Sequence, residues 1–199
     1  MKTVKSLAQK ENVRIIHITS RDMGVAFKKH IATQAHEHVR LILVCEKTAP
    51  KTADIAITLK GKNSSASVIW VWRGTKTMRS DIAISLVHAA PHTASSVHFK
   101  AACEDAARIS FTALAHVQKN AHDATTCINA HALMLSPSAI AFLKPDLEVE
   151  TDDAQARHGA SAGKPSDTEL FYLRSRGFSE KESIPLLREA FFHDIVSLA

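Results

Sequence analysis

The segment Ile109–Val117 reads ISFTALAHV and places an apolar residue at every second position. Successive side chains of an extended strand point to opposite faces, so a period of two predicts a strand with one buried face. An amphipathic helix would instead need apolar residues three and four positions apart. The segment therefore predicts a β-strand, and the same period recurs on both sides of it.

Further rows of alternating apolar residues flank this segment. They follow one another at intervals of roughly 12 to 15 residues, a spacing that fits either stacked parallel repeats or an antiparallel meander. Both arrangements keep one face of each strand buried. The rows are Val39–Cys45, Ile55–Leu59, Val68–Trp72, Ile82–His88, Val97–Cys103 and Ile128–Met134.

The turn chemistry favours open corners between the strands. The chain has no Asn-Gly or Asp-Gly dipeptide and only six glycines, whereas tight hairpins depend on such dipeptides. Small residues fill the narrow corners of a parallel β-helix, and the pairs Ala89-Ala90, Ala101-Ala102 and Ala106-Ala107 suit that position. We therefore expect a mainly β chain that forms a parallel β-helix, whose two open ends are natural surfaces for partner contact.

Two capping boxes predict a pair of helices after the β-rich region. In each box a Ser and a Glu three residues later satisfy backbone N–H groups of the first helical turn. They predict a first helix from about Asp167 to Arg176, stopped by Gly177, and a second from about Glu180 to Leu198. We expect residues 1–163 to form the β-helix core and residues 164–199 a C-terminal helical segment. The capping pairs are Ser166 with Glu169 and Ser179 with Glu182.

Three details of the predicted elements allow alternatives or rest on weaker patterns. Pro185 requires the second helix either to begin late or to kink, because proline is tolerated only near the first turn. The segment Arg14–Ile18 could open the solenoid, while Asp22–Thr33 could be an irregular connection or a short helix. The apolar stripe of the second helix would comprise Ile184, Leu187, Phe191, Ile195 and Leu198.

The composition limits the function classes. The 199 residues are 45% hydrophobic, and no run approaches the ~20 apolar residues that cross a bilayer. The N-terminal residues lack the apolar region of a secretory signal, so we expect a cytoplasmic protein without a membrane partner. The net charge of +5 comes from scattered basic residues. A nucleic-acid partner is therefore not expected, although steeply salt-dependent binding to DNA or RNA would reveal one.

The cysteines and histidines form no local metal motif. Cys45, Cys103 and Cys127 lie far apart in apolar segments, and we interpret them as buried small hydrophobic residues, with a thiolate ligand for iron as the alternative. Twelve histidines are present. His88 and His92 have the His-x-x-x-His spacing, but Pro91 lies between them, so they do not form a helical metal motif, and no His-Glu-x-x-His motif occurs. Most histidines are expected to be surface or lining residues and not metal ligands.

The stretch from Ala132 to Phe192 carries several motifs at fixed spacing. They resemble the core region of the SufB/SufD family, the scaffold proteins of the SUF system for iron–sulfur cluster assembly. Residues 87–93 and 100–108 resemble earlier coils of that family more loosely. The motifs are Leu133-Met134-Leu135-Ser136-Pro137, Lys144-Pro145-Asp146-Leu147-Glu148-Val149, Asp152-Asp153, His158-Gly159-Ala160-Ser161-Ala162-Gly163 and Leu170-Phe171-Tyr172-Leu173-Arg174-Ser175-Arg176-Gly177.

The resemblance implies a right-handed parallel β-helix that acts as a non-enzymatic scaffold. Its partners would be an ABC-type ATPase, SufC, and a SufB-like subunit, or a second copy associating through the β-helix. SufB-like chains carry a cysteine about nineteen residues before the histidine of this stretch and a glutamate directly after it. Here those positions are Ala139 and Gly159, so the chain is similar to the SufD branch.

The same resemblance suggests functional residues at the junction between solenoid and tail. His158 could be an iron ligand at a subunit interface, where a transient iron–sulfur cluster would be shared with a partner. The alternative is a structural histidine that is hydrogen-bonded to Asp152 or Asp153 at the end of the coil.

The residues Phe171, Tyr172, Arg174 and Arg176 of the tail could dock the ATPase. In the alternative, Leu170, Phe171 and Leu173 would only pack the first helix against the solenoid.

A β-helical carbohydrate-active enzyme is the alternative function. Asp152 and Asp153 are adjacent, and adjacent residues of an extended strand point to opposite faces, so the pair alone would not form a catalytic dyad. A groove with clustered carboxylates and aromatic residues would support this alternative. No glycine-rich phosphate loop occurs, so ATP hydrolysis by this chain is not expected.

Overall fold

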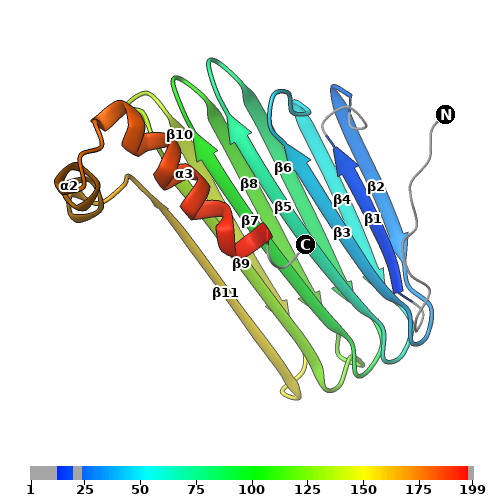
Figure 1. The fold of residues 1–199 in the computed structure, drawn as a ribbon. Coiled ribbons are helices and arrows are strands. Elements are labelled where there is room, and N and C mark those ends of the chain that lie inside the picture. The colour runs from blue at the N-terminus through cyan, green and yellow to red at the C-terminus, as the bar shows by residue number, and fades with distance from the viewer. Residues whose placement is uncertain (1–12, 20–23, 197–199) are drawn as a thin grey trace.

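The fold is a flat solenoid of parallel strands followed by two helices (Figure 1). We describe residues 13–19 and 24–196 from a computed structural model. The strands are β1 Val13–Thr19, β2 Ala26–Ala32, β3 His38–Cys45, β4 Thr52–Leu59, β5 Ser65–Gly74, β6 Arg79–His88, β7 Ala94–Cys103, β8 Arg108–Val117, β9 Ala124–Met134, β10 Ile140–Val149 and β11 Ala154–Gly163. The helices are α2 Asp167–Ser175 and α3 Glu180–Val196.

Consecutive strands alternate between two sheets. The six-stranded sheet has the order β1-β3-β5-β7-β9-β11, and the five-stranded sheet has the order β10-β8-β6-β4-β2. Every ladder is parallel, so each strand pairs with the equivalent strand of the next coil, a coil being one circuit of two strands. This arrangement confirms the predicted parallel β-helix and excludes the antiparallel meander.

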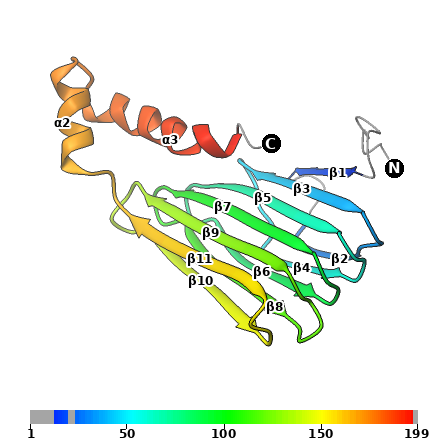
Figure 2. The same ribbon diagram turned by 90° about the horizontal axis from the view of Figure 1, so that it is seen from below.

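The core lies between the two sheets and consists of the alternating apolar residues. Trp70, Trp72, Phe99 and Phe111 are completely buried there. Phe99 of one sheet stacks on Phe111 of the other, with ring centroids 4.1 Å apart and ring planes 12° apart. Because buried aromatic rings contribute large apolar areas, these contacts join the two sheets into one layered body (Figure 2).

One corner of the solenoid repeats the same backbone geometry in successive coils. His36, Asn63, His92 and Asp123 all have positive φ angles, between 55° and 59°. Asn, Asp and His adopt this left-handed conformation more readily than other residues with a side chain. The N–H of each donates to a carbonyl of the next coil, as in the 2.8 Å bond from His92 to His122. The coils therefore turn without glycine-rich hairpins.

Helix α3 lies across the outer face of the six-stranded sheet (Figure 2). Phe192 and Ile195 are buried against Ile42, Ile69 and Val71 of that sheet. Because α3 covers these residues, outward positions of β3 and β5 are also hydrophobic. The helix thus covers a surface that would otherwise be exposed to water.

Charged contacts surround this apolar patch. The Arg73 guanidinium donates two hydrogen bonds of 3.1 Å to the carboxylate of Glu189. Arg188 bonds to Glu104, and Lys100 bonds to Asp194. Bidentate and partly buried pairs of this kind fix the orientation of a docked helix. They set how α3 lies on the sheet.

The structure corrects several local expectations. Ala101-Ala102 lies inside β7 and not at a corner, whereas Ala90 and Ala107 are buried beside corners as expected. The segment Asp22–Thr33 was expected to be an irregular connection or a short helix, but it contains strand β2. Its residues 22–23 lie outside the described residues. Helix α3 begins at Glu180 and continues through Pro185, so the late start is wrong; Leu198 lies outside the described residues.

Other local predictions are confirmed. Strand β1 contains the segment expected to open the solenoid. Ser166 and Glu169 form the predicted capping box of α2, and Gly177 after its last turn has a φ of 91°. Ser179 and Glu182 exchange the corresponding hydrogen bonds at the start of α3.

A buried histidine stands inside the β-helix. His88 is fully buried, with Nδ1 2.8 Å from Thr93 Oγ1 and Nε2 2.8 Å from Ser95 Oγ. Ser95 in turn lies 2.7 Å from Thr126 of the next coil. Burial lowers the pKa of His88 from 6.5 to about 4, because the charged imidazolium loses its hydration.

This histidine predicts a loss of stability in mild acid. The unfolded chain binds a proton at His88 below pH 6.5, whereas the folded chain binds it only below about pH 4. The free energy of unfolding should therefore fall as the pH drops through this window, by about 2 kcal/mol between pH 7 and pH 5. Urea unfolding at several pH values measures this slope.

Two variants test whether His88 causes this pH dependence of the free energy of unfolding. The slope should become shallower in His88→Gln and stay unchanged in His30→Gln, which alters an exposed histidine of β2 in the same sheet. Equal stability of the wild type at pH 7 and pH 5 would contradict the prediction.

Candidate functional site

The last coil forms an open end of the solenoid. Strand β10 pairs with β8, and β11 pairs with β9; no further strand of the described residues pairs with either. Pro145 lies within β10, which suits an end strand because proline cannot donate a ladder hydrogen bond. One edge of each sheet thus leaves backbone groups available to another chain.

His158 occupies the inner face of this last coil. It pairs in register with Ile128, which is completely buried in the preceding coil. His158 itself is exposed, because no further described coil covers it. Among the described contacts, none joins His158 to Asp152 or Asp153, and Asp153 instead lies 3.9 Å from His122. The structure therefore does not support a histidine held by these carboxylates.

The two positions that distinguish SufB-like chains lie in different surroundings. Ala139 is buried just before β10 and belongs to the main core. Gly159 pairs with Asn129 and points to the face opposite His158. A Cβ atom added at Gly159 would meet only Asn129 Oδ1, at 3.7 Å. The backbone therefore has room for a side chain at position 159, but that side chain would not stand beside His158.

Two of the three cysteines are buried as predicted. Cys45 and Cys103 are completely buried in the core. Burial raises the pKa of Cys45 to about 11 and that of Cys103 to about 12. Both thiols are therefore protonated near neutral pH and are poor iron ligands, since metal binding requires the thiolate.

The third cysteine differs from the prediction. Cys127 is only partly buried and lies on the outer face of the six-stranded sheet. Its sulfur is 3.3 Å from Arg157 Nε and 3.4 Å from Asn129 Nδ2. The alternation could have revealed this placement, because Cys127 precedes the buried Ile128 and must face the other way.

The first tail helix presents aromatic residues to solvent. Phe171 is 73% exposed and Tyr172 is 56% exposed, and α2 contains no buried residue. The Arg176 guanidinium lies 5.3 Å from the centre of the Tyr172 ring. Arg174 lies in the same last turn of the helix. The packing alternative is therefore wrong for Phe171, since α2 projects beside the end of the solenoid (Figure 2).

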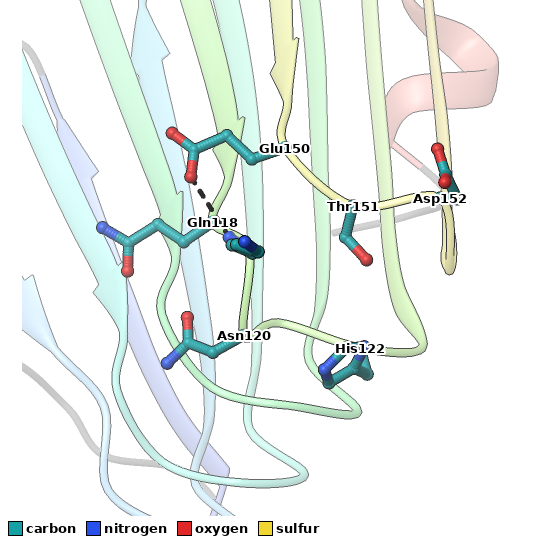
Figure 3. A pocket seen from close by; sticks show the side chains of 7 residues that line it. Gln118, Asn120, His122, Glu150, Thr151 and Asp152 are labelled. Carbon is teal, nitrogen blue, oxygen red and sulfur yellow. Dashed lines mark hydrogen bonds between the residues drawn. The ribbon is translucent and has the colours of Figure 1, made fainter.

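A cleft lies next to the last coil, at the turn between β10 and β11 (Figure 3). Asp152 and Asp153 lie in this turn and not on a strand, so the argument from opposite strand faces does not apply to them. Two carboxylates, of Glu150 and Asp152, line the cleft, but no aromatic residue does. The groove expected of a carbohydrate-active enzyme is not found here. The other lining residues are Gln118, Lys119, Asn120, His122 and Thr151.

The fold also joins residues that sequence motifs did not connect. His116 Nε2 lies 2.8 Å from Glu150 Oε1, although the two residues are 34 positions apart. This hydrogen bond, together with one from the Lys119 N–H, lowers the pKa of Glu150. His116 pairs in register with Glu148 of the next coil, two residues before Glu150, so only the coil register could have predicted the contact.

Within the described residues, no helix is long and apolar enough to span a membrane.

Comparison with known proteins places this chain in a family. Residues 5–191 match the model of the SufBD core domain of the SUF system for FeS cluster assembly. An iron–sulfur cluster assembly SufBD family protein of Mycobacterium tuberculosis is 27% identical over 140 residues, which are 70% of this chain and 16% of that protein.

Two further relatives have similar names. The iron–sulfur cluster assembly protein SufB of Bacillus subtilis is 26% identical over 132 residues, 66% of this chain and 28% of that protein. A SufBD family protein of Staphylococcus saprophyticus is 28% identical over 129 residues, 65% of this chain and 28% of that protein. The chain thus spans less than a third of each relative's length. Since the family model covers nearly all of the chain, this protein belongs to the SufBD family of the SUF iron–sulfur cluster assembly system.

Proposed function

We propose that this chain is a SufD-like, non-enzymatic scaffold subunit that works in the cytoplasm. The family match over residues 5–191 is the observation that carries this proposal. The SufD-like assignment rests on Ala139 and Gly159, which replace the cysteine and glutamate of SufB-like chains. Cys45 and Cys103 are buried with raised pKa values, which supports a subunit that relies on a partner for thiolate ligands.

The open end of the solenoid is the proposed contact with a SufB-like subunit or with a second copy of this chain. Strands β10 and β11 are the end strands of the two sheets. A partner strand could add to either edge through main-chain hydrogen bonds. Such addition would cover the inner face of the last coil, including His158, and give it a buried environment.

The helical tail is the proposed contact with a SufC-like ABC ATPase. Phe171 and Tyr172 offer exposed aromatic surface, and Arg176 lies over the Tyr172 ring. Aromatic and arginine side chains are the residue types that dominate binding energy at protein interfaces. Residues 164–199 would then serve as a docking module, held to the core by α3.

The iron–sulfur cluster would be a transient cargo shared between subunits. A neutral imidazole is a suitable ligand for iron, and His158 is exposed at the proposed interface. The partner would supply the remaining ligands. His158 would thus complete a shared site without forming one alone.

Substitution of the exposed aromatic residues tests the ATPase contact. Phe171→Ala with Tyr172→Ala should reduce co-purification of an ABC-type ATPase from the native host at least about tenfold, because hot-spot aromatics contribute more than 1 kcal/mol each. Pull-down followed by mass spectrometry gives the measurement. Leu114→Ala is the matched control, since Leu114 is an exposed hydrophobic residue of β8, which lies outside the tail and is not an end strand. Equal recovery with the double variant and the control would overturn the tail as the contact.

Replacement of His158 tests its role with the cargo. His158→Ala should leave the circular dichroism spectrum and the melting temperature unchanged, because the side chain is exposed. It should lower the yield of cluster on the reconstituted complex, measured by absorbance and iron content.

The control for this experiment is His17→Ala. His17 is an exposed histidine on β1, the end strand at the opposite edge of the same sheet. An unchanged cluster yield in His158→Ala, or an equal loss in both variants, would refute the role of His158.

A further inference from the structure

Three potential metal ligands converge on the outer face of the five-stranded sheet. His116 of β8 and Glu148 of β10 are register partners in adjacent parallel strands. Glu150 follows two residues later and continues the ladder through its N–H, which donates to the Val117 carbonyl at 2.9 Å. Because side chains alternate along a strand, Glu148 and Glu150 emerge on the same face as His116. One ligand atom from each of the three lies within 4.8 Å of the other two.

The position of each group suits a metal ligand. His116 is partly buried, which limits its rotation, and Nε2 faces the Glu150 carboxylate at 2.8 Å. The Lys119 N–H donates to the second oxygen of Glu150 at 3.2 Å and so orients this carboxylate. Hydrogen bonds of this type commonly orient carboxylate ligands.

We propose that His116, Glu148 and Glu150 form a binding site for one divalent first-row transition-metal ion. One imidazole and two carboxylates provide a mixed nitrogen and oxygen ligand set of the kind that zinc and ferrous iron accept. Ligand atoms sit about 2.0 to 2.2 Å from such an ion, so the exposed glutamate side chains need only small rotations to close the site. The fourth position would remain open to water.

The location distinguishes this site from the proposed cluster site. Glu150 also lines the cleft beside the turn that follows β10, so the open coordination position is accessible from solvent (Figure 3). His158 lies on the other sheet, in β11, and on its inner face. The proposal therefore does not depend on the role of His158 or on the assignment of the chain as a scaffold.

An ordinary surface ion pair is the competing explanation for this cluster. The role of Glu148 distinguishes an ion pair from a metal site. An ion pair needs only His116 and Glu150, whereas a metal site also needs Glu148. Glu148→Gln keeps the hydrogen bond between His116 and Glu150 and removes one anionic ligand. Because the three side chains are on the surface of the sheet, the variant should melt at the wild-type temperature.

The test is titration of the full chain, without a histidine tag, with Zn²⁺ in a calorimeter. We expect one ion per chain in the wild type and a loss of affinity of at least about tenfold in Glu148→Gln and in His116→Gln, since each removes a direct ligand. The absorption spectrum of bound Co²⁺ should change from that of the hydrated ion in the wild type only.

A second histidine–carboxylate pair provides the matched control. His92 Nδ1 lies 2.9 Å from Asp123 Oδ2, and His92 belongs to no such three-ligand group among the described residues. Asp123→Asn should bind Zn²⁺ as the wild type does. Absence of Zn²⁺ binding by the wild type, wild-type affinity in Glu148→Gln, or an equal loss in Asp123→Asn would each overturn the proposal.

Discussion

The packing of inward-facing side chains between the two sheets is the constraint on which the structure depends. Each parallel strand contributes alternate residues to this layer, and Phe99 stacks on Phe111 across it. A shift of register by one residue would turn every apolar side chain of a strand toward water. The interior therefore fixes the register, and the register fixes which residues of successive coils stand side by side. The ladder pairing of His116 with Glu148 is one consequence.

A stacked interior also makes the end coils, including the last coil, different from the inner coils. Inner coils are covered on both sides, whereas β10 and β11 are covered on one side only. The inner face of β11 accordingly carries an exposed histidine and small residues where β9 carries buried ones. A solenoid cannot bury its final coil alone, so this end needs either a cap or a partner. The subunit proposed to bind at this end would provide such cover.

The sequence predicted the fold well where a single physical rule dominates. Alternation identified the inward rows, and the capping boxes located both helices because cap chemistry is local. Strand β2 was missed because its inner positions include Lys29, which interrupts the apolar row at the other end of the solenoid. Pro185 made the start of α3 hard to predict from the sequence. The helix continues through this proline because the packing of Phe192 and Ile195 on the sheet outweighs the local cost of proline.

The candidate site was predicted only in part. Motifs at fixed spacing pointed to His158 and the tail, but exposure of Phe171 depends on where α2 projects, which no local pattern reveals. The contact of His116 with Glu150 spans a whole coil and follows only from the register.

Hydrogen exchange on an assembled complex tests the central claim most directly, namely that the last coil and the tail are the binding surfaces. The chain would be measured alone and with a SufB-like subunit and an ABC ATPase of the same system. We expect slower amide exchange in β11 and α2 on assembly and unchanged exchange in β1. Protection of β1 without protection of β11 and α2, or no protection in any of them, would contradict the account.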